Sequence, residues 1–183
     1  MMRPEGGGVP GLARLLHNGQ LCVLATVDAD GAPYTTFMSW VSARDDHTVC
    51  MAIDRRGVAL RNMQQNPAVA LEILAPDRVL GIRGTARVCS DQVQSCPFPA
   101  VLVEIDVLEG RDHTGRGIVW QGPAYSYIEG KEHRYAVEWA VLAEIRAGAV
   151  MGPSNEMCRE WIGLTLVGHK VEYWPPQGVA SDQ

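Results

Sequence analysis

The chain has 183 residues, of which 46% are hydrophobic, and carries 16 basic and 21 acidic side chains for a formal net charge of −5. This length fits a single domain with short arms, and the apolar fraction supports a packed core. The acidic balance argues against a nucleic-acid binder, which would show a basic excess. No run approaches 18 apolar residues, so we expect no membrane span.

The five cysteines form neither a CxxC pair nor a Cys/His spacing suited to a metal, so no metal site is expected. Cys22 and Cys50 lie inside apolar runs, where a free thiol behaves as a small hydrophobic group. An odd number of cysteines without a signal peptide predicts a reducing, cytoplasmic location.

Residues 1–11 are predicted to be a flexible start. Residues 6–11 match the glycine spacing of a dinucleotide-binding loop, but no strand precedes them and Pro10 favours a plain loop. Residues 12–17 are a short helix candidate that Asn18 and Gly19 would end.

Residues 21–27 and 33–41 are predicted to be two strands joined by a turn at 28–31, which together make a hairpin. A second turn at 44–47 leads into a third strand over 48–53. Successive strands joined by short turns are typical of an antiparallel sheet.

The third strand runs into a basic turn that holds Arg55, Arg56 and Arg61 and opens a helix, which should end near residues 66–67. The first N–H groups of a helix are unpaired and point outward, so this junction is suited to bind an anion. The alternative is a solvent-exposed turn, the usual place for arginine. Asp54 is well placed to cap a helix that starts at Arg55.

Two more strands are predicted over 68–74 and 79–89, and glycines at 81 and 84 mark bulges or close backbone approaches in the second. Alternating apolar residues predict a strand over 101–108, followed by a long loop over 109–127.

A helix is expected over about 129–147, because Val137, Val141 and Ile145 share one stripe. A last strand over 164–174 and a loose tail over 175–183 complete the chain. The whole pattern predicts class α+β dominated by β, with an antiparallel barrel in a single domain over 12–174.

Three segments resemble, in their order along the chain, the FMN-binding split-barrel proteins, the superfamily of pyridoxamine 5′-phosphate oxidase. They are the hairpin at 21–33, the block at 61–71 and the strand at 83–88. The resemblance covers residues 12–108 and resumes at 171–174. It implies a six-stranded Greek-key split barrel with flanking helices, and a homodimer with one FMN at each interface site.

The resemblance further implies that the flavin lies outside the barrel, since a small barrel fills its interior with side chains. The ring would contact the strand 33–41, whose alternation places Thr36, Met38 and Trp40 on one face. The backbone of 52–54 would read the pyrimidine edge, and the turn at 55–57 with Arg61 would bind the phosphate. The predicted cofactor-binding residues are Thr35, Thr36, Met38, Ser39, Trp40, Ala52, Ile53, Asp54, Arg55, Arg56, Gly57, Arg61, Asn62 and Trp120.

Thr36 and Ala59 stand where the family's oxidase often has an arginine and a lysine for the phosphate, and no Arg-x-His follows residue 174. Genuine pyridoxamine 5′-phosphate oxidase activity is therefore not expected. Arg55, Arg56 or Arg61 would take over the phosphate, because a guanidinium fork suits it.

We expect an FMN-dependent oxidoreductase that transfers hydride or electrons between a reduced nicotinamide, or a small organic substrate, and the flavin. Two alternatives stay open: a flavin-binding or sensing module without turnover, and a split barrel that binds haem or a deazaflavin. The sequence assigns no catalytic side chain, because flavin chemistry needs little from the protein beyond binding and orientation.

Overall fold

A computed structural model describes residues 7–116, 122 and 127–148. Every described residue belongs to one compact unit within residues 1–150. The predicted last strand, the predicted tail and Trp120 lie outside the described residues.

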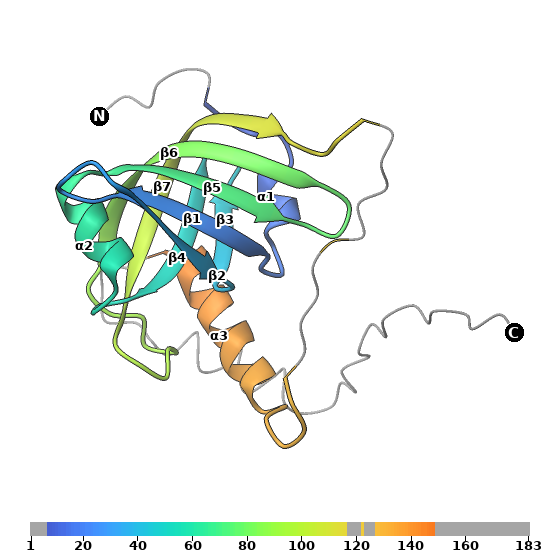
Figure 1. The fold of residues 1–183 in the computed structure, drawn as a ribbon. Helices are drawn as coiled ribbons and strands as arrows, with labels where there is room; N and C mark the ends of the chain where they lie inside the picture. Colours follow the sequence, from blue (N-terminus) through green and yellow to red (C-terminus); the bar gives the residue numbers. More distant parts are fainter. Residues whose placement is uncertain (1–6, 117–121, 123–126, 149–183) are drawn as a thin grey trace, which may run out of the picture. The chain divides into compact units, whose positions relative to one another are not determined.

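A seven-stranded antiparallel sheet is the main structural element of the described chain (Figure 1). The strands lie in the order β2-β1-β5-β6-β7-β4-β3. Their bounds are β1 (Leu21–Val27), β2 (Pro33–Met38), β3 (Val41–Asp45), β4 (Thr48–Asp54), β5 (Ala68–Leu74), β6 (Val79–Ser90) and β7 (Ala100–Asp112). The prediction of a mostly β, antiparallel fold is confirmed, and the sheet is consistent with a split barrel.

The prediction of six strands, with one continuous strand over 33–41, was wrong. The chain bends at Ser39 and Trp40, so that β2 and β3 are separate strands. They stand at the two edges of the sheet, and no ladder between described residues closes it. Because only two residues join the two edges, the sheet curls until its edges approach each other at this bend.

Three helices accompany the sheet within the described ranges: α1 (Leu12–Leu15), α2 (Val58–Gln65) and α3 (Arg134–Ala147). Both longer helices begin later than predicted, at Val58 instead of Arg55 and at Arg134 instead of about 129. The predicted long loop after 108 also starts later, because β7 continues to pair with β6 as far as Leu80↔Asp112. None of the described helices is long and apolar enough to cross a membrane.

Two apolar clusters lie on opposite faces of β4, whose side chains alternate between them. Met51 and Ile53 point into the first cluster, inside the curled sheet, and Cys50 and Ala52 into the second, under α3. Burial raises the pKa of Cys50 to about 11 and that of Cys22 to about 12, so both thiols are the small hydrophobic groups that the sequence predicts.

The glycine positions of β6 are close backbone approaches, as predicted. A Cβ on Gly81 would lie 2.3 Å from Cε1 of His113, whose ring rests on the strand and whose Nδ1 is 2.8 Å from Glu72 Oε1. A Cβ on Gly84 would meet Ile105 and the Asp106 carbonyl, and the register shifts at this point. Any side chain at these two positions would force its neighbours apart.

Candidate functional site

The turn between β4 and α2 is closed by Asp54, which does not cap the helix. Asp54 Oδ1 accepts the backbone N–H of Arg56 at 2.8 Å and its Nε at 3.2 Å, while Oδ2 accepts from Nη2 at 3.1 Å. These bonds lower the pKa of Asp54, and the side-chain bond from Arg56 has the largest effect. The predicted cap was wrong because the chain forms this local turn before the helix begins.

The N-terminus of α2 has no side-chain cap. Its N-cap residue is Gly57, in extended conformation, and no acidic residue stands in the first turn. Among the described residues, no side chain accepts from the first N–H groups of the helix, so nothing in this part of the chain compensates the positive end of the helix dipole. The geometry supplies the donors that an anion requires.

The three arginines around this helix end differ in their partners. Arg56 is tied to Asp54, so its charge is balanced locally. Among the described residues, Arg55 and Arg61 have no ion-pair partner, and both are exposed. Arg61 is the fourth residue of α2, and long helical side chains lean toward the preceding turn. Arg55 and Arg61 are thus the two unbalanced cations beside the open helix end.

The last residues of β4 have one backbone edge that β3 does not cover. The pairing of β3 with β4 ends at Val41↔Met51, and beyond it the Ala52 N–H donates to the Trp40 carbonyl at 3.2 Å. The other edge is paired with β7 as far as Asp54↔Ala100. Since the side chains of Ala52 and Ile53 are buried, only backbone groups of this stretch can reach a ligand.

Strand β2 presents two different faces. Met38 packs against the first apolar cluster and Thr36 is half-buried on the same face. Thr35 and Phe37 point outward, and Phe37 is 58% exposed. The bend breaks the alternation, so Trp40 packs against the second cluster, and the prediction that it shares a face with Thr36 and Met38 was wrong.

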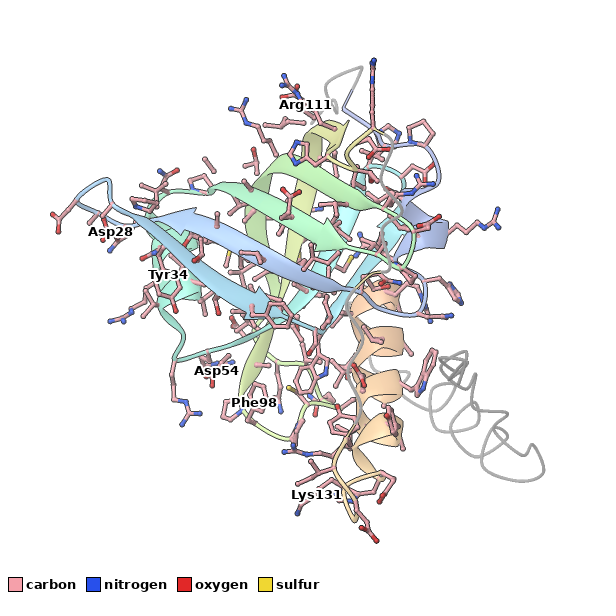
Figure 2. The ribbon with its side chains drawn as sticks, turned by 45° about the vertical axis from the view of Figure 1, so that its right-hand side comes forward. Asp28, Tyr34, Asp54, Phe98, Arg111 and Lys131 are labelled. Atoms are coloured by element: carbon pink, nitrogen blue, oxygen red, sulfur yellow. The ribbon has the colours of Figure 1, made fainter. Side chains whose placement is uncertain are left out.

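Trp40 stacks on Phe98, with ring centroids 5.2 Å apart and an interplanar angle of 14°. Phe98 belongs to the loop 91–99, which joins β6 to β7. The same loop reaches the basic turn, because the Pro99 carbonyl accepts the Arg55 N–H at 2.9 Å. Figure 2 shows Asp54 and Phe98 near each other, in agreement with the Asp54↔Ala100 pairing.

The predicted cofactor-binding residues include neither Phe98 nor Phe37, although the ring was expected to contact the strand that holds Phe37. Phe37 lies on the outward face of its strand. An aromatic side chain on an outward face indicates a binding surface, and this was the signal that could have identified it. Phe98 stands between two prolines, in the segment between the strands predicted over 79–89 and 101–108, and no local pattern connects it with Trp40.

Asn62 is buried in α2, and its Nδ2 donates to Thr26 Oγ1 at 3.0 Å. Its amide therefore fastens the helix to β1. Ser39 is half-buried at the bend, and Gly57 occupies the helix N-cap. In the part of the chain that the structure describes, no group of three or more His, Cys, Asp or Glu side chains could hold a metal ion.

Comparison with known proteins gives one family. A family model described as pyridoxamine 5′-phosphate oxidase matches residues 10–109, which is 100 of the 183 residues. No curated protein matches the chain in sequence.

Solved structures are similar over rather more than half of the chain. A candidate pyridoxamine 5′-phosphate oxidase from Lactobacillus delbrueckii is 24% identical, covering 61% of this chain and 99% of its own, with a TM-score of 0.48. An F420 reductase is 24% identical, covering 56% and 98%, with a TM-score of 0.48. HupZ of group A Streptococcus is 18% identical, covering 63% and 98%, with a TM-score of 0.50, and this likeness concerns the fold alone.

Proposed function

The chain belongs to the pyridoxamine 5′-phosphate oxidase family, and from this premise we propose that it is a cytoplasmic, homodimeric, FMN-dependent oxidoreductase. The family binds FMN in general, and its members are commonly dimeric. The observation that carries the proposal is the uncapped N-terminus of α2, beside which Arg55 and Arg61 lack ion-pair partners among the described residues.

This helix end fits a phosphate monoester in charge and in hydrogen bonding. Backbone N–H groups at the start of α2 would donate to the phosphate oxygens, and Arg55 and Arg61 would neutralise them. Arg56 contributes less, because its guanidinium already serves Asp54. These residues replace the two cations that are missing at Thr36 and Ala59.

The isoalloxazine ring would lie outside the sheet, where Thr35 and the exposed ring of Phe37 face solvent. On the uncovered edge of β4, the Ala52 carbonyl and the Asp54 N–H would offer polar groups to the pyrimidine edge of the ring, because the polar groups of Ile53 face β7. A second subunit would bury Phe37 and the flavin together, since an exposed aromatic ring of this size favours a partner surface. A contact between Trp120 and the flavin stays a prediction from the sequence.

Bound FMN would supply the acceptance and release of a hydride or of electrons. The chain's own residues would bind and orient it: the helix end fixes the phosphate, the β4 edge orients the ring and the partner subunit excludes water. The donor would be a reduced nicotinamide or a small organic substrate. Pyridoxamine 5′-phosphate oxidation itself is not part of the proposal.

The proposal is tested by identifying the chromophore of the purified protein and by titrating the apoprotein with FMN. We expect one FMN per subunit, bleached by NADH or NADPH under anaerobic conditions and restored by an electron acceptor. A protein that takes up no FMN, or that carries haem or a deazaflavin instead, overturns the cofactor assignment. A flavin that binds but is never reduced makes the protein a flavin carrier or sensor.

A further inference from the structure

The carboxylate of Glu144, on α3, holds the loop 91–99 by two backbone hydrogen bonds. Oε1 accepts the N–H of Gln94 at 2.6 Å and Oε2 accepts the N–H of Ser95 at 2.7 Å. Both bonds are short and made to carboxylate oxygens, a combination that places them among the stronger hydrogen bonds of a protein. The loop is thereby fastened to a helix about 50 residues further along the chain.

The other end of this loop reaches the candidate phosphate turn. Pro99 accepts the Arg55 N–H, and Phe98 stacks on Trp40, the residue whose carbonyl accepts the Ala52 N–H. In the middle of the loop, Val93 is buried in the second apolar cluster with residues of α3. One continuous set of contacts therefore runs from α3 through the loop to the turn.

A carboxylate is the side chain that this position requires. Two N–H donors converge on it, and each of its oxygens accepts one of them. A glutamine of the same shape has a single acceptor oxygen, so its NH2 group would face one of the two donors. The bond lost in this way leaves a backbone N–H group without its partner.

We propose that Glu144 is a positioning residue for the phosphate-binding turn. It fixes the loop 91–99, and the loop in turn fixes the backbone of Arg55 through the Pro99 carbonyl and thereby the direction of the Arg55 side chain. This inference rests on the proposed function, because it assigns Glu144 a role in holding the phosphate of FMN.

The test compares FMN with riboflavin, which has the same ring but no phosphate. Glu144→Gln should weaken FMN binding about tenfold while changing riboflavin binding less than about twofold, both measured by flavin fluorescence titration of the apoprotein. Glu132→Gln is the matched control, since the Glu132 carboxylate accepts the Gly130 N–H and its own backbone N–H, both within its own turn, and the change should leave both affinities unchanged.

Gln94→Pro tests the same contact from the loop side. It removes the N–H that Oε1 accepts, and proline suits the second position of the turn that the Cys96 N–H to Val93 carbonyl bond closes. It should lower FMN affinity in the same selective way, so the test stands even where the Glu144 variant folds poorly.

Three results separate the possibilities. Equal losses for FMN and riboflavin mean that Glu144 only supports the fold, and unchanged FMN affinity means that the loop does not act on the turn; either result overturns the inference. Failure of the unaltered protein to bind FMN overturns the proposed function instead, so the two failures are distinguishable.

Discussion

Asn62 Nδ2 donates to Thr26 Oγ1 at 3.0 Å, and both side chains are buried between α2 and β1. This bond holds in place the helix whose N-terminus forms the candidate phosphate site. Asn62→Ala should destabilise the protein by about 1–3 kcal/mol, because the buried Thr26 hydroxyl loses its partner. Urea denaturation measures the change.

The double variant Asn62→Leu with Thr26→Val provides the control for this bond. When both partners become apolar, no unpaired polar group stays buried. The double variant should therefore lose less free energy of unfolding than the sum of the losses of Asn62→Leu and Thr26→Val measured singly. Strictly additive losses would contradict the assigned hydrogen bond.

The two unbalanced arginines should dominate the affinity for a phosphate. Arg55→Ala and Arg61→Ala should each weaken FMN binding about tenfold or more, because each removes a charge-assisted contact. Arg56→Ala is the matched control and should have less than about a threefold effect, since Arg56 is engaged by Asp54 and its side chain is 74% exposed. Fluorescence titration at two salt concentrations measures both the affinity and its electrostatic part, and full affinity in all three variants would contradict the phosphate assignment.

Arg44 pairs with Glu104, a carboxylate with 3% side-chain exposure that Arg87 also contacts. Arg44→Met should destabilise the protein by about 1–3 kcal/mol, because it leaves a buried carboxylate with fewer partners. Arg83→Met is the matched control: the Arg83–Glu109 pair lies on the surface, and its loss should cost less than about 1 kcal/mol. Equal losses in the two variants, by urea denaturation, would contradict this ranking.

Asp46 fastens α1 from a distance, since its carboxylate accepts the N–H groups of Ala13 at 3.1 Å and Gly11 at 2.9 Å. The bond from Ala13, followed by that from Gly11, lowers the pKa of Asp46 below its ordinary value of 3.8. A carboxyl group whose pKa is lowered in the folded state stabilises the fold at pH values above its ordinary pKa. This stabilisation is lost as the pH falls through the folded-state pKa.

Asp46→Ala should therefore be less stable than the unaltered protein at neutral pH, and the difference should shrink as pH falls below 3.8. Thermal unfolding across this pH range checks the trend, and amide hydrogen exchange at Gly11 and Ala13 reports the local effect. A difference that grows toward low pH would contradict the assigned bonds.

Much of the sheet could be predicted, because hairpin turns and alternation are local. The bounds of β1 and β5 agree with the sequence reading, and those of β4 and β6 differ by one residue. The bend at Ser39 and Trp40 could not be predicted, because it arises where Met38 joins one apolar cluster and Trp40 the other. A strand pattern read by itself contains no information on which cluster each residue joins.

The position of the candidate site in the chain could be predicted, but the roles of its individual residues could be predicted less well. A basic turn that leads into a helix is visible in sequence, but the pairing of Arg56 with Asp54 distinguishes it from Arg55 only in three dimensions. The contacts of Glu144 join side-chain oxygens to backbone N–H groups about 50 residues away. Because every residue except proline has a backbone N–H, the sequence does not show which of these groups will be the donors.

The cap that Asp46 places on α1 also bears on the order in which the chain acquires structure. A helix of four residues is too short to form alone. The acceptor for the N–H groups of Gly11 and Ala13 is the Asp46 carboxylate, which lies in the connection between β3 and β4. During synthesis the first helix therefore emerges before the residue that stabilises it. We therefore expect the contacts of α1 with Asp46 to form only once the connection between β3 and β4 lies beside it.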